Sequence, residues 1–163
     1  MKKNTEKTNV MRILDQKKID YQSHCYADTD ALSGVEVAAA LNQNPDRVFK
    51  TLVTVSASKN NYVFLVPVEK ELDLKKAAKV VGEKSISMIK SKDLLALTGY
   101  IHGGCSPIGM KKQLVTTIHS TACDFEKILF SAGKIGYQVE VAIGDVEKVI
   151  RFTLHDIAVQ AEE

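Results

Sequence analysis

Two features of the sequence could do chemistry together, and the first is a glycine-rich bend. It reads Gly103-Gly104-Cys105-Ser106-Pro107-Ile108-Gly109-Met110 and contains three of the nine glycines and one of the three prolines. The backbone must turn sharply here, and successive turn residues can direct several N–H groups at one oxygen atom. The bend is therefore a candidate binding surface for a carbonyl or phosphate oxygen, and an ordinary surface turn is the alternative.

The second feature is Lys50, which interrupts the apolar run Val48-Phe49-Lys50-Thr51-Leu52-Val53. Alternate residues of a strand share a face, so both faces of this run would be largely apolar. The ammonium group must then reach solvent, pair with an acid, or face an anionic ligand in a cleft. A fixed cation beside backbone donors suits an ester carbonyl next to a phosphodiester. A lysine that snorkels from an edge strand is the alternative interpretation.

Conventional catalytic motifs are missing from the sequence. It contains no G-x-S-x-G, H-E-x-x-H or Walker pattern, so the serine hydrolase, zinc hydrolase and P-loop classes lose their usual anchors. Cys105 and His102 could supply a thiol nucleophile, but residues three apart on a turn need not face each other, and a small buried or incidental cysteine is favoured. No metal site or cofactor is predicted, because the remaining histidines show no paired spacing and are interpreted as structural or surface residues: His24, His119 and His155.

Two lysine pairs could form a basic rim for a polyanion. They are Lys75-Lys76 and Lys111-Lys112, although charged faces of helices and turns are usually just solvated. The formal net charge is only +2, from 22 Lys and Arg against 20 Asp and Glu. Contact with nucleic acid would therefore depend on local patches and would be weak without the help of a partner.

The length of 163 residues predicts a single domain over residues 1–163, with a core that needs no covalent staples. The three cysteines, an odd number without C-x-x-C spacing, argue against a disulfide framework and a zinc knuckle and favour a reducing cytoplasm. No apolar segment follows the charged N-terminus, and no run is long enough to span a membrane. We expect a cytoplasmic protein that does not contact a membrane.

The scaffold that positions these residues should mix helices and strands. Helices are expected at 9–18, 37–41, 74–81, 91–97 and 145–149, with a capping box at residues 33–36, an Asp73 cap, and glycines 82 and 99 as helix ends. Strands are expected at 21–26, 48–56, 62–66, 85–89, 114–119, 128–131 and 137–141, with an extended piece at 150–154 and turns at 122–124 and 133–136. The second and third strands form a central hairpin. Because strict βαβ alternation is missing, we predict an α+β fold: a mixed, partly barrel-like β-sheet flanked by helices.

Four motifs follow one another along the chain. They are Phe49-Lys50-Thr51-Leu52, then Leu72-Asp73-Leu74-Lys75-Lys76, then Gly99-Tyr100 running into the bend, and finally Ser131-Ala132-Gly133-Lys134. In this order they resemble the YbaK/EbsC family of aminoacyl-tRNA deacylases, which is similar to the editing domain of bacterial prolyl-tRNA synthetase. The resemblance spans nearly the whole chain. It implies a mixed sheet wrapped by helices and the hydrolysis of misacylated tRNA, most typically cysteinyl-tRNA for proline.

The resemblance also implies a role for each matching residue. Lys50 matches the family's essential lysine, expected to hold the backbone at the 3′-terminal adenosine, while Gly103, Gly104 and Pro107 match a Gly-x-x-x-Pro loop that positions the aminoacyl carbonyl. Substrate contacts are expected from Tyr26, Ser33, Thr51, Cys105, Ser106, Pro107, Ser131 and Gln138. Ser33 stands where family members can carry an aromatic residue and Gln138 where some carry Asp. These departures leave open the size and polarity of the pocket, and hence the amino acid removed.

In the cysteine-editing members of the family, the thiol of the substrate attacks its own ester carbonyl while the protein fixes the geometry. The resemblance therefore implies trans-editing of Cys-tRNA(Pro), with the aminoacylated tRNA 3′ end as ligand and prolyl-tRNA synthetase as protein partner. Two alternatives stay open. One is a deacylase for another small misacylated species such as Ala-tRNA(Pro), with water as the nucleophile. The other is a non-catalytic module that binds aminoacyl-tRNA or a nucleotide.

Overall fold

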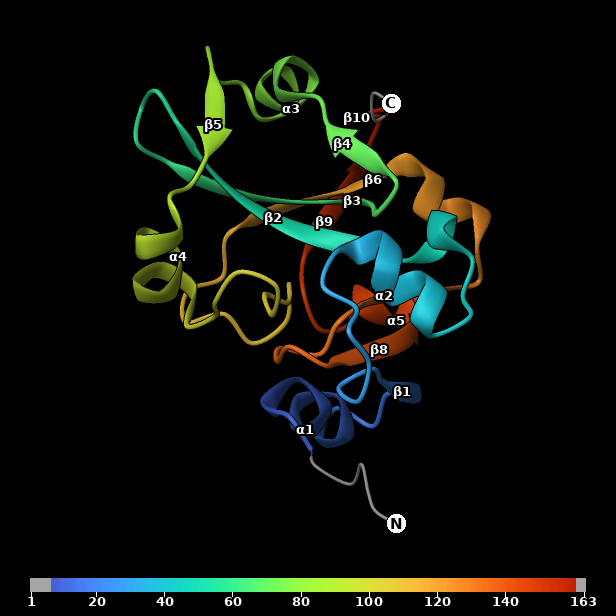
Figure 1. The fold of residues 1–163 in the computed structure, drawn as a ribbon. Helices are drawn as coiled ribbons and strands as arrows, with labels where there is room; N and C mark the ends of the chain where they lie inside the picture. Colours follow the sequence, from blue (N-terminus) through green and yellow to red (C-terminus); the bar gives the residue numbers. More distant parts are fainter. Residues whose placement is uncertain (1–6, 161–163) are drawn as a thin grey trace.

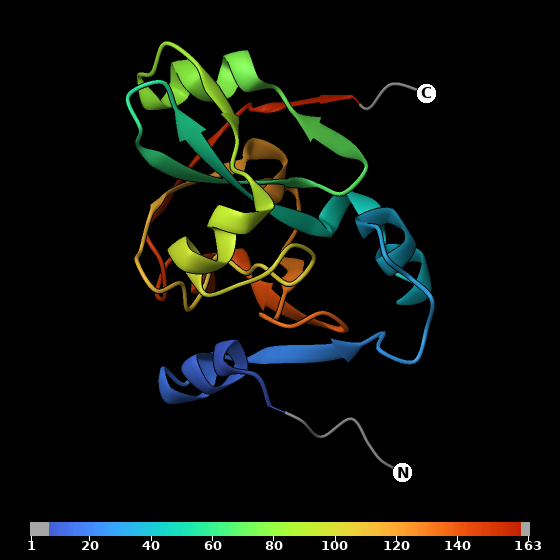
Figure 2. The same ribbon diagram turned by 60° about the vertical axis from the view of Figure 1, so that its left-hand side comes forward.

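The computed structural model describes residues 7–160, in which short helices surround three β-sheets (Figure 1, Figure 2). The helices are α1 (Asn9–Gln16), α2 (Gly34–Ala40), α3 (Leu74–Val81), α4 (Ser91–Thr98) and α5 (Ile143–Val146), with 3-10 turns η1 (Pro45–Arg47) and η2 (Ser120–Asp124). The strands are β1 (Tyr21–Cys25), β2 (Phe49–Ser56), β3 (Asn61–Pro67), β4 (Lys70–Leu72), β5 (Ile86–Met88), β6 (Val115–His119), β7 (Lys127–Ser131), β8 (Tyr137–Ala142), β9 (Phe152–His155) and β10 (Ala158–Gln160).

The central sheet has five strands in the order β5-β2-β3-β6-β9. The predicted hairpin of β2 and β3 is confirmed and lies inside this sheet, with antiparallel pairing from Phe49–Pro67 to Val55–Asn61. β6 and β9 add to it in parallel, so the sheet is mixed. A second sheet has the order β1-β8-β7, and β10 pairs with β4 in a third. The α+β class is confirmed, although no closed barrel forms within residues 7–160.

The apolar residues divide into three clusters that hold these layers together. The main cluster lies between the central sheet and the β1-β8-β7 sheet and includes α1, which buries Val10 and Leu14 completely. A second cluster packs Phe64 and Val66 against α3 on the other face of the central sheet. A third lies under α2. In Figure 1, α3 and α1 accordingly lie at opposite ends of the molecule, with the central sheet between them.

Local sequence signals explain where the helices begin and end. The Ser33 hydroxyl accepts the Glu36 N–H, and the Glu36 carboxylate accepts the Ser33 N–H at 2.9 Å, so the predicted capping box is confirmed. Asp73 caps α3 as predicted. Gly82 and Gly99 end α3 and α4 in the left-handed region, at φ 76° and 87°, where glycine adds no steric cost.

Three predictions about the position or type of an element were wrong. The last helix is α5 at Ile143–Val146 and not at 145–149, because β8 runs directly into it and Asp145 lies inside the helix instead of at its start. The final extended piece is β9, two residues later than predicted at its start. Residues 122–124 belong to η2 and not to an open turn. The pairing of β4 with β10 was missed because each strand has only three residues, too few for a periodic pattern.

No helix in the described part of the chain is both long enough and apolar enough to cross a membrane.

Candidate functional site

A pocket of about 370 Å³ opens where the central sheet approaches the β1-β8-β7 sheet. One wall is residues 49–53 of β2, and the start of α2 closes one side with Ser33, Gly34 and Val37. The segment from β5 into α4 supplies apolar side chains, the glycine-rich bend contributes Gly103 and Cys105, and Ser131 and Gln138 come from β7 and β8. Segments far apart in the sequence therefore meet at one cavity of the size that small ligands occupy.

Strand β2 has a gap in its pairing at this pocket. Its outer edge starts against β7 through a bridge between Val48 and Leu129, and it pairs with β5 only from Thr54 onward. Between these points, residues 50–52 have no strand partner on this edge within the described structure. The Val53 carbonyl accepts the Ile89 N–H at 3.1 Å on the same edge. Because alternate residues direct their peptide groups to the same edge, the N–H and C=O of Thr51 face the gap.

Lys50 lies beside this gap with its side chain half-buried in the pocket wall. Burial lowers the pKa of its ammonium group, and the negative charge of Glu71 offsets this only in part. Within residues 7–160, the ammonium group has no hydrogen bond or ion pair. A cation held in this state favours an anionic group such as a phosphate, which would restore the solvation lost on burial.

The strand that carries Lys50 is anchored just upstream by Arg47, which binds a buried acid on β8. Arg47 donates to the Glu140 carboxylate at 3.2 Å and to the Lys127 carbonyl at 3.2 Å, and His24 contacts the other Glu140 oxygen at 2.8 Å. Burial opposes ionisation of Glu140, but the hydrogen bond to His24 and the charge of Arg47 outweigh it and lower the pKa of Glu140. This network fixes the start of β2 to the β1-β8-β7 sheet, so the two walls of the pocket are held together.

The glycine-rich bend takes part differently from what the sequence suggested. Gly103 and Cys105 line the pocket together with the preceding His102, whereas Gly104, Ser106 and Pro107 are buried and do not line it. The Gly104 N–H is not available to a ligand, because it donates to the Ile101 carbonyl at 3.0 Å. Gly103 and Cys105 both line the pocket, and within residues 7–160 their N–H groups donate no hydrogen bond to the protein.

The Cys105 thiol does not fit the role of a nucleophile. The residue is only 7% exposed, and burial raises the pKa of its thiol to about 12, which a hydrogen bond with Thr98 opposes weakly. The thiolate is the reactive form, and very little of it exists at neutral pH with such a pKa. The structural interpretation of Cys105 is therefore favoured over the thiol nucleophile.

Two buried polar atoms in the pocket have no partner. In the described residues, three buried side-chain oxygens lack any hydrogen bond: Oγ1 of Thr51, Oγ1 of Thr121 and Oε1 of Gln138. Thr51 and Gln138 both line the pocket. The other predicted polar contacts are engaged locally, because Ser33 Oγ accepts the Glu36 N–H at 3.2 Å and Ser131 Oγ accepts the Gly133 N–H at 3.0 Å. Unsatisfied buried atoms are rare and call for an explanation, such as a ligand.

The pocket brings together most of the residues singled out in the sequence. Those that line it are Tyr26, Ser33, Lys50, Thr51, Gly103, Cys105, Ser131 and Gln138. Sequence reasoning missed the apolar lining, of which Phe49, Met88 and Leu94 are examples, because apolar residues in strands and helices are interpreted as core. Neither predicted lysine pair lines the pocket. No group of three or more His, Cys, Asp or Glu that could hold a metal occurs within residues 7–160.

Comparison with known proteins places this pocket in a family. Residues 29–149 match the family model of the aminoacyl-tRNA editing domain. EbsC of Enterococcus faecalis, a candidate Cys-tRNA(Pro)/Cys-tRNA(Cys) deacylase, is 48% identical over 142 residues, which cover 86% of this chain and 87% of that protein.

Two solved structures share the fold. The hypothetical protein APE2540 has a TM-score of 0.82 at 17% identity and covers 92% of this chain and 99% of its own. A candidate trans-editing enzyme for prolyl-tRNA synthetase has a TM-score of 0.79 at 20% identity and covers 96% of this chain and 100% of its own. The family model and the EbsC match together confirm the resemblance seen in the motifs: the chain belongs to the aminoacyl-tRNA editing domain family.

Proposed function

We propose that this protein is a trans-editing deacylase that releases cysteine from Cys-tRNA(Pro). The observation that carries the proposal is the unpaired Lys50 ammonium beside the gap in β2, in the pocket of an aminoacyl-tRNA editing domain. A cation next to unpaired backbone groups is complementary to an ester that is joined to a phosphodiester chain. The name of the EbsC relative supports cysteine as the amino acid.

The pocket residues act by orienting the ester and stabilising its charge. Lys50 binds the phosphate end of the terminal adenosine, and the N–H groups of Gly103 and Cys105 face the ester carbonyl. The substrate sulfur forms a bond to its own carbonyl carbon, the bond to the ribose oxygen breaks, and the thiol proton passes to that oxygen. A four-membered thiolactone is released, and water opens it to cysteine. Orientation of such an intramolecular attack lowers the barrier by several kcal/mol, and an oxyanion donor adds about 3 kcal/mol.

A mechanism that requires a thiol in the substrate would discriminate between amino acids more strongly than the shape of a small pocket can. Shape alone separates amino acids that differ by one methylene by about 1–3 kcal/mol. Serine is close to cysteine in size, but its hydroxyl group is a much poorer nucleophile than a thiol at neutral pH. A seryl ester would therefore bind without reacting. Alanine has no nucleophile at all.

Selection of the tRNA must come from outside the pocket. The terminal adenosine that the pocket would bind is the same in tRNA(Pro) and tRNA(Cys), and the EbsC relative is named for both. A net charge of +2 gives the protein little general attraction for tRNA. We therefore include a contact with prolyl-tRNA synthetase in the proposal, because a synthetase that holds the mischarged tRNA would supply both affinity and identity. Its substrate would place the protein in the cytoplasm.

The test is the release of free tRNA from Cys-, Ser- and Ala-tRNA(Pro) under steady-state conditions. We expect rapid release from the cysteinyl ester only, and Ser-tRNA(Pro) is the matched control for size. Protection of the cysteinyl ester against spontaneous hydrolysis would instead identify a binding module. Rapid cleavage of Ala-tRNA(Pro) would identify water as the nucleophile and contradict the substrate-assisted mechanism.

A further inference from the structure

One of the residues that line the pocket, Gln138, has a buried side-chain acceptor that no group in residues 7–160 satisfies. Gln138 is 8% exposed, and its Oε1 has no hydrogen-bond partner in the described structure. Its two cross-strand neighbours are His24 on β1 and Ser131 on β7. His24 contacts Glu140 and Ser131 accepts the Gly133 N–H, and neither of them bonds to Gln138 Oε1.

The gap in β2 adds further acceptors to the same pocket. Thr51 Oγ1 is the second unpartnered oxygen, and the Thr51 carbonyl faces the gap. None of the residues that line the pocket in the described structure is Asp or Glu. The pocket therefore offers several neutral oxygens and no carboxylate, which suits a group with more than one N–H donor.

On the basis of the proposed function, we propose that Gln138 and Thr51 bind the α-amino group of the aminoacyl ester, so that cleavage requires this group to be free. An α-amino group carries two or three N–H donors and can satisfy both orphan oxygens at once. The ribose hydroxyl has a single donor and lies toward Lys50 with the rest of the nucleotide. The substrate thiol is a weak donor and must remain free to attack the carbonyl.

The assignment also accounts for the neutral side chain at position 138. A carboxylate in the same pocket would attract the Lys50 ammonium and compete with the phosphate for it. The amide oxygen of Gln138 accepts a hydrogen bond without adding charge. Lys50 then stays available for the nucleotide. The phosphate is bound by Lys50 on β2, and the amino group is bound by Thr51 on β2 together with Gln138 on β8.

The experiment compares Cys-tRNA(Pro) with 3-mercaptopropionyl-tRNA(Pro), which keeps the thiol but lacks the α-amino group. Each kcat/KM is divided by the hydrolysis rate of the same ester without protein, because the amino group changes the intrinsic reactivity. We expect wild type to prefer the cysteinyl ester by about 10- to 100-fold, the range for a lost hydrogen bond to a charged group. Gln138→Met should lose about this factor on the cysteinyl ester and change less than about twofold on the other. Thr51→Val, which keeps the shape of the side chain, should show the same pattern.

Gln22→Met is the matched control, since Gln22 is exposed on β1 and does not line the pocket. It should leave both rates unchanged. Equal normalised rates of wild type on the two esters would overturn the α-amino site while leaving the deacylase function intact, and this measurement does not depend on whether a variant folds. Equal losses of Gln138→Met on both esters would overturn it as well. A wild type that cleaves neither ester would contradict the proposed function and the α-amino site together.

Discussion

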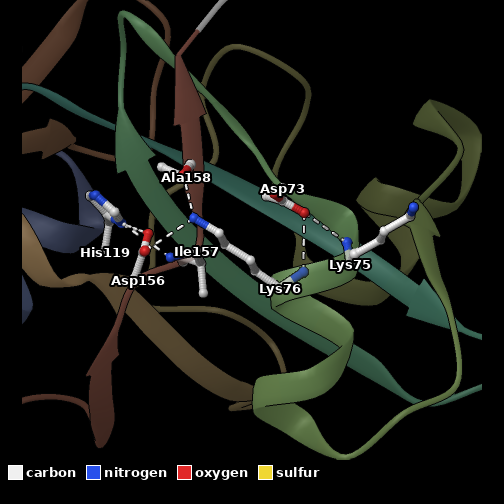
Figure 3. Close-up of polar contacts among 7 residues, drawn as sticks. All are labelled: Asp73, Lys75, Lys76, His119, Asp156, Ile157 and Ala158. Atoms are coloured by element: carbon white, nitrogen blue, oxygen red, sulfur yellow. Dashed lines mark hydrogen bonds and ion pairs between the residues drawn. The ribbon is translucent and has the colours of Figure 1, made fainter.

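Two regions of the molecule contain a lysine beside buried polar groups, and they differ in whether those groups are paired. One is the pocket with Lys50. The other is the C-terminal clamp, which we define as Asp73, Lys76, His119, Asp156 and Ile157 (Figure 3). In the clamp, Lys76 donates to Asp156 at 3.0 Å, and the Ile157 N–H donates to His119 Nδ1 at 3.2 Å. The Asp73 N–H donates to the Ile157 carbonyl at 2.8 Å.

Paired polar groups stabilise the fold in the C-terminal clamp, whereas unpaired polar groups in the pocket are available to bind a ligand. The C-terminal clamp uses every one of these contacts to fix the chain ahead of β10 against α3, so its polar groups are satisfied by the protein. Within residues 7–160 the pocket leaves Lys50, Thr51 Oγ1 and Gln138 Oε1 without a partner, which costs stability and leaves these groups available to a ligand. The two residues are both lysines, and they differ in that Lys76 has an ion-pair partner whereas Lys50 has none within residues 7–160.

The largest expected effect comes from exchanging these lysines for alanine in parallel. Lys50→Ala should lower kcat/KM for Cys-tRNA(Pro) by about 10²–10³-fold, as for the loss of one preorganised electrostatic contact, with little change in the free energy of unfolding. Lys76→Ala should keep wild-type activity and lower the free energy of unfolding by no more than about 1 kcal/mol, because its ion pair is largely exposed. Deacylation rates and urea unfolding of both variants measure this. Full activity of Lys50→Ala would remove the distinction.

A smaller effect is expected from the pH dependence of the C-terminal clamp. Burial, with help from the charge of Lys70, lowers the pKa of His119 below its ordinary value. The neutral form is therefore favoured in the folded state, so this contribution to stability is fully present above the unfolded pKa of about 6.5 and is lost as the pH falls through the folded value.

His119→Asn removes the titrating ring and keeps an oxygen that can accept the Ile157 N–H. Urea unfolding at pH 7.5 and 5.5 should show a drop in the free energy of unfolding for wild type and a smaller drop for His119→Asn. The same drop in both proteins would show that His119 is not the group that titrates.

The smallest expected effect is on Cys105. Cys105→Ala should keep kcat/KM within about twofold of wild type, because a thiol with a pKa of about 12 is not the nucleophile. It should lower the free energy of unfolding by about 1 kcal/mol, since it empties space in a buried position. Deacylation of Cys-tRNA(Pro) by the two proteins measures this. If a folded Cys105→Ala variant were inactive, Cys105 would be the nucleophile after all, and the reaction would pass through a covalent intermediate on the protein.

Much of the site could be predicted because its residues break local rules. Lys50 was conspicuous as a cation in an apolar strand, and the structure leaves it unpaired in the described chain. The caps at Ser33 and Asp73 were equally readable, because a cap depends on residues within one turn of the helix.

The sequence could not show which of several possible hydrogen-bond partners a given group binds in the folded protein. Gly104 looked like a donor for a ligand, but its N–H bonds to Ile101 within the bend, which depends on the path of the whole loop. Met88 and Leu94 obey the rules of core residues, and only the tertiary arrangement turns them toward a cavity. Gln138 Oε1 has no partner in the described structure although His24 and Ser131 lie opposite it on the neighbouring strands, and no local pattern in the sequence records this.

The interrupted edge of β2 has a consequence for how this protein behaves in a crowded cell. An exposed strand edge normally invites another chain to add to the sheet, and this is a route to aggregation. Here the bridge to β7 covers one end of the opening and β5 covers the other. Residues 50–52 are then the part of this edge left without a strand partner in the described structure, and Lys50 places a charge beside the opening. An edge of three residues is too short for a strand of another molecule to pair with it, but it is long enough to bind one small end group. This part of β2 can therefore offer main-chain groups to a ligand without inviting another strand to pair at the same edge.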